Sequence, residues 1–370
     1  MPVAATLSLY IARMFAGSLG VMLAGLTGIV GLFDFIELLR RAASKPAATF
    51  AIVGQMAALR LPWIAMQILP FAVLLGGILA FWKLTRSSEL IVARASGVSA
   101  WQFLAAPVLC AVAIGCLATM AVSPLSAALL AREQAMESAY LTVGAGPLSL
   151  SGGQLWLRQA DTALAPHGVA ILHARGVALR HGTLTAQGVS IFRLDPADHL
   201  LQRVEANQAR LVGKAWDMPA ARTILPGHLP SAPRPFVLPT NMTVARIQES
   251  FAPPDTLSFW ALPGFIALLE HAGFSSARHR LEFQTLLALP LLAGTMTLLA
   301  AGFSMRPARR GGVARMLASG VAAGFALFVI SKIAQEFGQS GALPPVLAAW
   351  VPAASGLMLA VALLLHLEDG

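Results

Sequence analysis

The sequence predicts an α-helical membrane protein with six transmembrane helices, three on each side of an inserted antiparallel β-domain. Of the 370 residues, 57% are hydrophobic and only 12% are charged, which is roughly half the charged fraction of a soluble domain. The hydrophobic residues gather into six runs, each long enough to cross about 30 Å of hydrocarbon. These runs are residues 11–39, 61–82, 101–122, 281–305, 313–337 and 346–367. Between the third and fourth runs, short alternating segments predict strands instead.

The first run continues into a charged segment, so we expect a retained helix rather than a cleaved signal peptide. Asp34, Glu37 and Arg41 share one face of this helix, and Glu37 can pair with Arg41 at four-residue spacing. The alternative interpretation is functional. Arg40, Arg41 and Lys45 would then form a basic cluster at the membrane interface that binds the phosphates of a lipid head group.

A polar stretch at residues 86–99 separates the second and third runs. Ser87 can cap a short helix there, with Glu89 in its first turn and Gly97 at its end. One face of this helix would have charged side chains at its edges and small side chains in its middle. Such a face could pack into a groove of another protein. The residues of that face are Arg86, Glu89, Leu90, Ala93, Arg94 and Gly97. A loop that happens to be helical is the alternative.

The inserted domain is predicted to begin with an amphipathic helix at residues 125–140 and to continue as strands. The strands are expected at residues 153–158, 169–173, 184–193 and 200–205, with one or two more in 206–216. Such regular spacing is typical of an antiparallel sandwich or jelly roll. The Pro-rich residues 226–239 are expected as a loop or an extended edge. The predicted domains are residues 1–124, 125–257 and 258–370.

Basic residues in two short loops predict the orientation in the membrane. The loops after the second and fourth runs contain Lys83, Arg86, Arg94, Arg306, Arg309, Arg310 and Arg315. Two spans separate these loops, so they share a face, and the positive-inside rule makes that face cytoplasmic. Both termini are then cytoplasmic and the β-domain lies outside. The basic residues around the first loop count against this orientation: Arg40, Arg41, Lys45 and Arg60.

The sequence contains no pattern of a catalytic or nucleotide-binding site. It lacks the G-x-x-x-x-G-K-[ST], H-E-x-x-H and G-x-S-x-G patterns, so ATP hydrolysis would need a separate protein. Cys110 and Cys116 fall on different faces of one helix, and no histidines have metal-ligand spacing. We therefore predict no enzyme activity, no cofactor and no metal. Lys332 and Glu336 lie four apart near the outer end of the fifth run. They form either a mutual pair or the wall of a substrate cavity that faces the first span.

Taken together, these segments resemble the LptF/LptG-type lipopolysaccharide export permeases, and most closely the LptG side of that family. The matching segments are residues 34–41, 88–99, 188–193, 343–350 and 364–370. Two features depart from the family pattern. Some relatives have a basic residue where Asp34 stands, and the β-domain is poorer in aromatic residues than a lipid-binding groove would be.

The resemblance implies an inner-membrane permease that extracts lipopolysaccharide from the outer leaflet of the inner membrane. An LptF-like chain would be its partner, an LptB-like ATPase dimer would drive it, and an LptC-like single-span protein would insert beside span one. The helix at about residues 86–97 would be the coupling helix, and the β-domain a periplasmic jelly roll. Spans one and five would form lateral gates. The residues expected at the lipid and gate are Asp34, Glu37, Arg40, Arg41, Lys45, Lys332 and Glu336. A permease for lipoprotein release or envelope signalling, or an envelope scaffold, are the alternatives.

Overall fold

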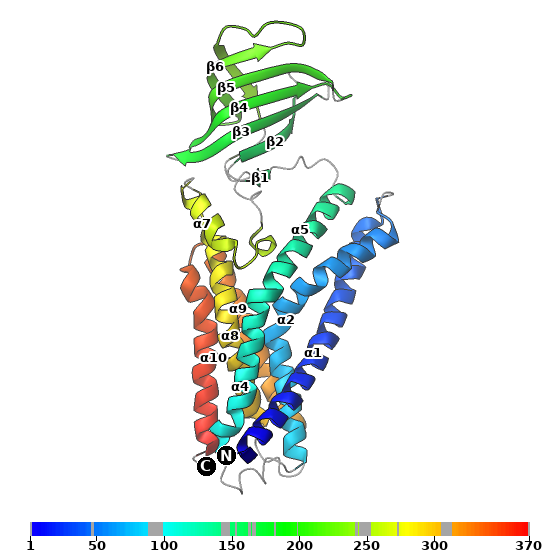
Figure 1. The fold of residues 1–370 in the computed structure, drawn as a ribbon, viewed down its shortest axis with the longest axis vertical. Helices are drawn as coiled ribbons and strands as arrows, with labels where there is room; N and C mark the ends of the chain where they lie inside the picture. The colour runs from blue at the N-terminus through cyan, green and yellow to red at the C-terminus, as the bar shows by residue number, and fades with distance from the viewer. Residues whose placement is uncertain are drawn as a thin grey trace. The chain divides into compact units, whose positions relative to one another are not determined.

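The computed structural model describes most of the chain as two compact units (Figure 1). The described residues are 2–45, 48–87, 99–141, 149–151, 154–161, 164, 168–180, 183–197, 199–240, 243, 253–271, 274–304 and 313–368. The helical unit comprises Met1–Leu141, Asp255–Leu262 and Ala277–Gly370, and the β-unit comprises Thr142–Pro254 and Pro263–Ser276.

Six long apolar helical segments make up the helical unit, which confirms the number of membrane-spanning helices that the sequence predicts. They are α1 (Pro2–Ala42), α2 (Phe50–Arg86), α4 to α5 (Ala100–Leu117 and Ser123–Tyr140, joined by η1 at Ala118–Val122), α8 (Ala277–Ser304), α9 (Val313–Gln339) and α10 (Pro345–Glu368). The first three span-forming segments are each 37 residues long. Since about 20 residues cross a bilayer, these helices extend beyond it or tilt within it.

The helices pack around α8. About 72% of its most apolar stretch is buried, compared with 11% for α1 and 22% for α9. Glycines let the backbones approach closely, as expected of membrane helices. A Cβ atom on Gly76 would lie 2.6 Å from Leu19 Cα on α1, and one on Gly115 would lie 2.6 Å from Pro290 Cα on α8. The core is thus built on α2 and α8, and α1 and α9 lie at its edge.

The third span does not end at Ser123–Pro124, where the sequence predicts its boundary. The helix continues to Tyr140, because the turn before the proline is a π-helix, η1. In that wider turn the N–H of Ser123 donates to the carbonyl of Ala118, five residues earlier. The proline then sits in the first turn of α5, where its missing N–H costs little. The expected amphipathic helix at residues 125–140 is present as α5.

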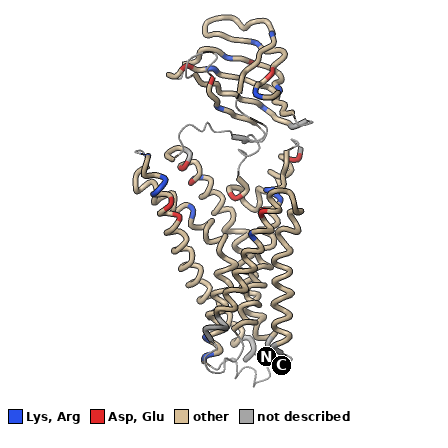
Figure 2. Tube along the Cα trace, turned by 180° about the vertical axis from the view of Figure 1, so that it is seen from behind, with Lys and Arg blue, Asp and Glu red and all other residues tan. Residues whose placement is uncertain are grey.

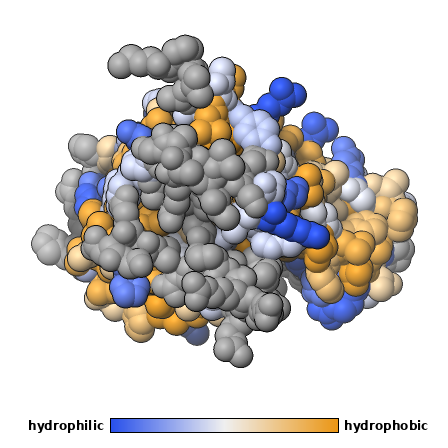
Figure 3. Space-filling view, turned by 90° about the horizontal axis from the view of Figure 1, so that it is seen from below, coloured by the Kyte–Doolittle hydropathy of each residue, from blue (hydrophilic) through white to orange (hydrophobic). Residues whose placement is uncertain are grey.

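The basic C-terminal end of α2 and the C-terminal end of α8 lie at the same end of the helical unit. Thr85 Oγ1 donates to the carbonyl of Ser304 at 3.4 Å. The first turn of α1 and the last turn of α10 are at this end as well (Figure 1). Figure 2 shows charged residues gathered at the two ends of the helices, with an almost uncharged middle. Apolar side chains show on the outer sides of the helices in the end-on view (Figure 3).

The β-unit contains one antiparallel sheet of seven strands in the order in which they occur in the chain. The strands are β1 (Ser149–Ser151), β2 (Gln154–Ala160), β3 (Val169–Arg180), β4 (Thr183–Leu194), β5 (Leu200–Val212), β6 (Ala215–Ile224) and β7 (Arg234–Pro239). This confirms an inserted antiparallel β-domain. Its described strands form a meander, and they do not show the crossed strand order that defines a Greek-key jelly roll. The Pro-rich segment supplies the edge strand β7, as expected.

The turn after β4 is formed by Asp195, in the segment 195–198, whose Asp and Pro residues favour turns. Its Oδ1 atom accepts hydrogen bonds from the backbone N–H groups of Ala197 and His199, each at 2.8 Å. The His199 N–H, together with weaker contacts, holds the pKa of the Asp195 carboxyl below its usual range.

The sheet curls so that its inner face encloses an apolar core. Leu155, Leu172, Ile191 and Trp216 are fully buried there. The curl brings β2 next to the end of β7, five strands away in the sheet. Gln159 Nε2 on β2 donates to the carbonyl of Pro239 at 2.8 Å, and its Oε1 atom accepts from Thr240 Oγ1 at 2.6 Å.

A buried ion pair closes one end of this core. Arg193 on β4 contacts both carboxylate oxygens of Asp161, with 2.9 Å between Nη2 and Oδ1, and its Nη1 donates to Gln202 at 2.7 Å. The two side chains are only 8% and 3% exposed. Arg193 also lies over the Phe236 ring, at 5.6 Å from the centroid. The pair therefore connects β4 with the end of β2 and with β7.

We expect Arg193→Met to destabilise the β-unit by about 3–5 kcal/mol, because it leaves the Asp161 carboxylate buried without a counter-charge. Hydrogen exchange of the β2 and β4 amides in the full chain measures the loss. Arg210→Met, at an exposed position of β5, is the matched control. It should change the stability by less than about 0.5 kcal/mol. Equal effects of the two substitutions would contradict this role.

Candidate functional site

Five charged side chains from three helices meet near one end of the helical unit, and we call them the charge cluster. They are Asp34 and Arg41 on α1, Arg60 on α2, and Glu133 and Glu137 on α5. Arg60 Nη1 lies 3.2 Å from Asp34 Oδ1 and 3.9 Å from Glu133 Oε1. Arg41 forms an ion pair with Glu137.

Arg60 is the central member of the charge cluster. The Glu133 side chain is only 1% exposed, and those of Asp34 and Arg60 are each 21% exposed. Carboxylates at this depth are costly unless a cation neutralises them. Glu133 Oε1 and Asp34 Oδ2 have no hydrogen-bond partner within the described chain. The guanidinium of Arg60 is therefore what allows two carboxylates from different helices to lie here together.

The sequence prediction for the end of α1 is partly wrong. Glu37 does not pair with Arg41. It pairs with Arg40 instead, at 2.6 Å and on an exposed surface. Arg41 on α1 pairs instead with Glu137 on α5. Lys45 lies in the loop after α1 and is half-buried. Arg40 and Arg41 thus each have a carboxylate partner within this chain.

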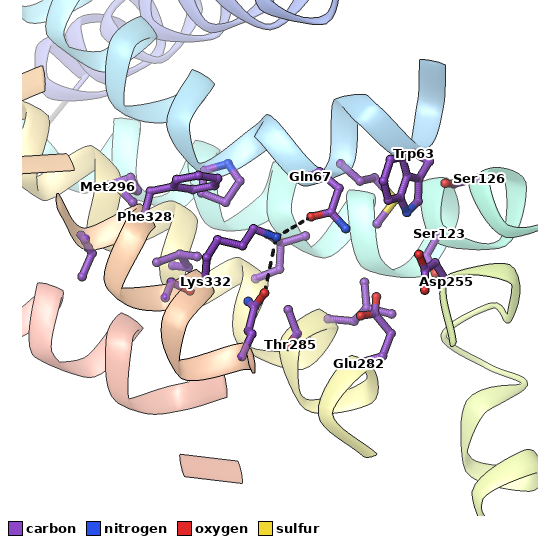
Figure 4. Close-up of a pocket in the computed structure, with 18 of the residues that line it drawn as sticks. Trp63, Gln67, Ser123, Ser126, Asp255, Glu282, Thr285, Met296, Phe328 and Lys332 are labelled. Atoms are coloured by element: carbon purple, nitrogen blue, oxygen red, sulfur yellow. Dashed lines mark hydrogen bonds between the residues drawn. The ribbon is translucent and has the colours of Figure 1, made fainter. Parts of the chain in front are cut away.

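A pocket lined by both apolar and polar side chains lies between α2, α5, α8 and α9 (Figure 4). Lys332 on α9 extends toward Gln67 on α2, and its Nζ donates to Gln67 Oε1 at 2.9 Å. Its ammonium also lies 5.8 Å from the centroid of the Phe328 ring. Glu282 and Asp255 line the other side of the pocket. The space is about 100 Å³, which is enough for a few water molecules.

Lys332 therefore lines a cavity, but not the one predicted. The pocket wall comes from α2, α5, α8, α9 and residues near 255, so it does not face the first span. The alternative prediction, a pair with Glu336, is replaced by hydrogen bonds to Gln67 and, at 3.4 Å, to Gln335. The reason is geometric. Gln67 on the neighbouring helix accepts from the Lys332 ammonium where both side chains line the pocket, whereas Glu336 is not among the residues that line it.

Only the first residue of the predicted coupling face lies within the described structure. Arg86 is in the last turn of α2, with its guanidinium 5.6 Å from the centroid of the Trp82 ring. Ser87 ends α2, with its N–H donating to the Lys83 carbonyl at 3.0 Å. The other members lie outside the described residues: Glu89, Leu90, Ala93, Arg94 and Gly97.

Sequence reasoning missed the roles of Arg60, Glu133 and Gln67. In the sequence, Arg60 is only a basic residue near the first loop. No acidic residue lies three or four positions away from it on the same helix. The sequence feature that could have indicated this cluster is the spacing of Glu133 and Glu137. They are four residues apart, so they share one face of the amphipathic segment that became α5.

Residues 9–366 match the family described as lipopolysaccharide export system permease LptF/LptG. The chain belongs to this family. It is 24% identical over 370 residues to the lipopolysaccharide export system permease protein LptG of Escherichia coli K12, covering 96% of this chain and 97% of the relative. The protein of the same name from Haemophilus influenzae is 22% identical over 358 residues, with 94% of each chain covered.

In this LptF/LptG family member we expect Arg60→Met to lower the free energy of unfolding by about 3–5 kcal/mol, because two carboxylates lose their counter-charge. Unfolding of the detergent-solubilised chain measures this loss. Adding Asp34→Asn and Glu133→Gln to Arg60→Met should recover most of it. Arg13→Met, at an exposed position of α1, is the control and should have little effect. A triple variant as unstable as Arg60→Met would contradict the assignment.

Proposed function

We propose that this chain is the membrane-permease subunit of a lipopolysaccharide exporter, which takes lipopolysaccharide from the outer leaflet of the inner membrane. The observation that carries the proposal is the extent of the family match. It runs from residue 9 to residue 366 and so includes all six apolar helices and the inserted β-domain. The two relatives named above as lipopolysaccharide export permeases are covered over nearly their whole length.

The proposed orientation places the basic C-terminal end of α2 and the C-terminal end of α8 in the cytoplasm. Lys83 and Arg86 end α2, and the hydrogen bond from Thr85 to Ser304 joins this end to α8. Because positive residues are retained on the cytoplasmic side, both termini would be cytoplasmic and the β-unit periplasmic. The charge cluster at the opposite end of α1 would then lie near the outer leaflet.

The energy would come from a separate ATPase, since the sequence has no phosphate-binding loop. An LptB-like dimer would receive the segment at about residues 86–97 in a groove. Glu89, flanked by Arg86 and Arg94, would transmit its motion. Ala93 and Gly97 would allow close approach because their side chains are small or absent.

Partner proteins would cover the two helices that this chain leaves most exposed. Only 11% of the apolar stretch of α1 and 22% of that of α9 are buried, the lowest values among the six described segments. Phe33 and Ile36 on α1, and Ile330 and Phe337 on α9, are exposed. Spans one and five would form lateral gates against an LptF-like chain, with an LptC-like helix beside α1. Asp34, Glu37, Arg40, Arg41, Lys45, Lys332 and Glu336 would lie along the lipid path.

Charge reversal at the coupling segment tests the proposed energy source. Glu89→Lys should abolish stable association with the LptB-like ATPase and stop export, because the carboxylate would no longer meet a basic groove. Co-purification and lipopolysaccharide transport measure the two effects. Glu368→Lys, at the last residue of α10 on the same proposed face, is the control and should retain both. Unchanged association and export in Glu89→Lys would contradict the proposal.

Photocrosslinking tests the proposed cargo. A photoreactive residue at position 41 or 332 of the co-expressed complex should capture lipopolysaccharide when ATP is present. The same residue in place of Met358, which is exposed on α10, should not. Capture of a lipoprotein instead would support the other permease class, and equal capture at all three positions would contradict a defined lipid path.

A further inference from the structure

The face of the sheet opposite its apolar core has an unusual break in alternation. Along β3, β4 and β5, side chains that face the core alternate with side chains that face outward. In each strand this alternation shifts by one residue, and the three shifts lie next to one another across the sheet. Buried or partly buried residues of the apolar core flank the shift at a spacing of three, where regular alternation requires two or four. The flanking residues are Ala174 and Val177, Ala186 and Val189, and Ala206 and Ala209.

Two consecutive residues of each strand therefore face outward in this row. The ladder pairs Ala174 with Val189 and Gly176 with Gln187 but leaves out Arg175 and Gly188. Gly188 has a φ of +60°, a conformation that favours glycine. A Cβ atom there would collide with the guanidinium of Arg175, so Arg175 lies directly across Gly188. The result is a crease that runs across three strands.

The crease opens into a polar space that we call the outer hollow. Its first part has a volume of about 570 Å³ and is lined by Arg175, Gly176, Gln187, Gly188, Asn207 and Gln208. A second part of about 500 Å³ shares three of these residues and extends toward β6. Volumes of this size are typical of small-molecule sites. Almost every side chain of the first part is an amide or a guanidinium.

The outer hollow has an excess of positive charge. Arg175, Arg203 and Arg222 line its second part, together with a single carboxylate, Glu205. Arg203 pairs with Glu205, and its Nε is buried without a hydrogen-bond partner in the described chain. Arg175 and Arg222 are exposed. Two guanidiniums beyond the one neutralised by Glu205 remain to receive an anion.

An aromatic surface lies at the edge of the outer hollow. The Trp156 ring packs on the ring of His173, with 4.2 Å between centroids, and the Trp156 residue is 41% exposed. His173 itself lines the hollow. A flat aromatic face suits the C–H face of a sugar ring, amides suit its hydroxyl groups, and guanidiniums bind phosphate or carboxylate through paired hydrogen bonds.

We propose that the outer hollow binds an anionic sugar, an oligosaccharide that carries phosphate or carboxylate groups on its rings. The inference rests on the proposed function, which brings an acidic glycolipid to this chain. The hollow suits a sugar better than a lipid chain, because most of the side chains that line it are polar. The hollow would hold the sugar portion on the outer face of the sheet, away from the apolar interior.

Direct binding to the full chain in detergent tests this inference. The probe is deacylated, phosphorylated lipopolysaccharide oligosaccharide, with the same material after phosphatase treatment and neutral maltoheptaose as comparisons. The double variant Arg175→Gln/Arg222→Gln should bind the probe at least about tenfold more weakly, because two charge-assisted contacts are lost. Added salt should weaken wild-type binding. Arg210→Gln, an exposed β5 residue outside the hollow, is the matched control and should bind as the wild type does.

Each outcome has a defined meaning. Loss of binding after phosphatase treatment assigns phosphate as the anion, and retained arginine-dependent binding assigns the sugar carboxylates. Binding that is equal in the double variant and in the wild type overturns the inference. So does equal binding of maltoheptaose or of polyglutamate, the latter pointing to an acidic protein partner. If the oligosaccharide fails to bind while positions 41 and 332 still capture lipopolysaccharide, this inference fails and the proposed function stands.

Discussion

Arg60 lies between a carboxylate of α1 and a carboxylate of α5, and much of the helical unit depends on this arrangement. The most apolar stretch of α1 is only 11% buried, and its buried apolar residues, such as Phe15 and Leu38, lie in two separate clusters toward its two ends. Besides these apolar clusters, α1 is attached by the close contact at Gly76 and by the ion pairs from Asp34 and Arg41. Electrostatic contacts between helices in a low-dielectric environment are strong when paired and costly when broken. Separating α1 from its neighbours would therefore cost free energy at these ion pairs, which the proposed gating of α1 would have to supply.

The two faces of the sheet in the β-unit differ in chemistry. The inner face is filled by small and branched apolar residues and is closed at one end by Arg193 and Asp161. The outer face has the crease, whose polar side chains converge. Residues 188–193, one of the segments by which the chain resembles its family, contribute to both. Gly188 makes room for Arg175 across the crease, and Arg193 forms the buried ion pair.

Much of the architecture was predictable from the sequence because hydrophobic runs and alternation are local patterns. The six spans, the inserted antiparallel domain, the turn at Asp195 and the edge strand after the prolines follow from such patterns. The contacts between elements could not be predicted from the sequence, because they depend on which faces of different helices pack against each other. Glu37 had two possible partners at helical spacing, and the choice of Arg40 became clear only once α5 supplied Glu137 to Arg41. The continuation of the third helix through Pro124 depended on a π-turn that has no clear sequence signal.

The central claim is that this chain moves lipopolysaccharide out of the membrane with energy from a separate ATPase. The most direct measurement uses proteoliposomes that contain this chain together with its LptF-like, LptB-like and LptC-like partners. It follows the transfer of lipopolysaccharide to a soluble acceptor after ATP is added. The account predicts transfer that requires ATP and is lost when this chain is omitted. Transfer that proceeds equally without this chain, or no transfer from a complex that hydrolyses ATP, would contradict it.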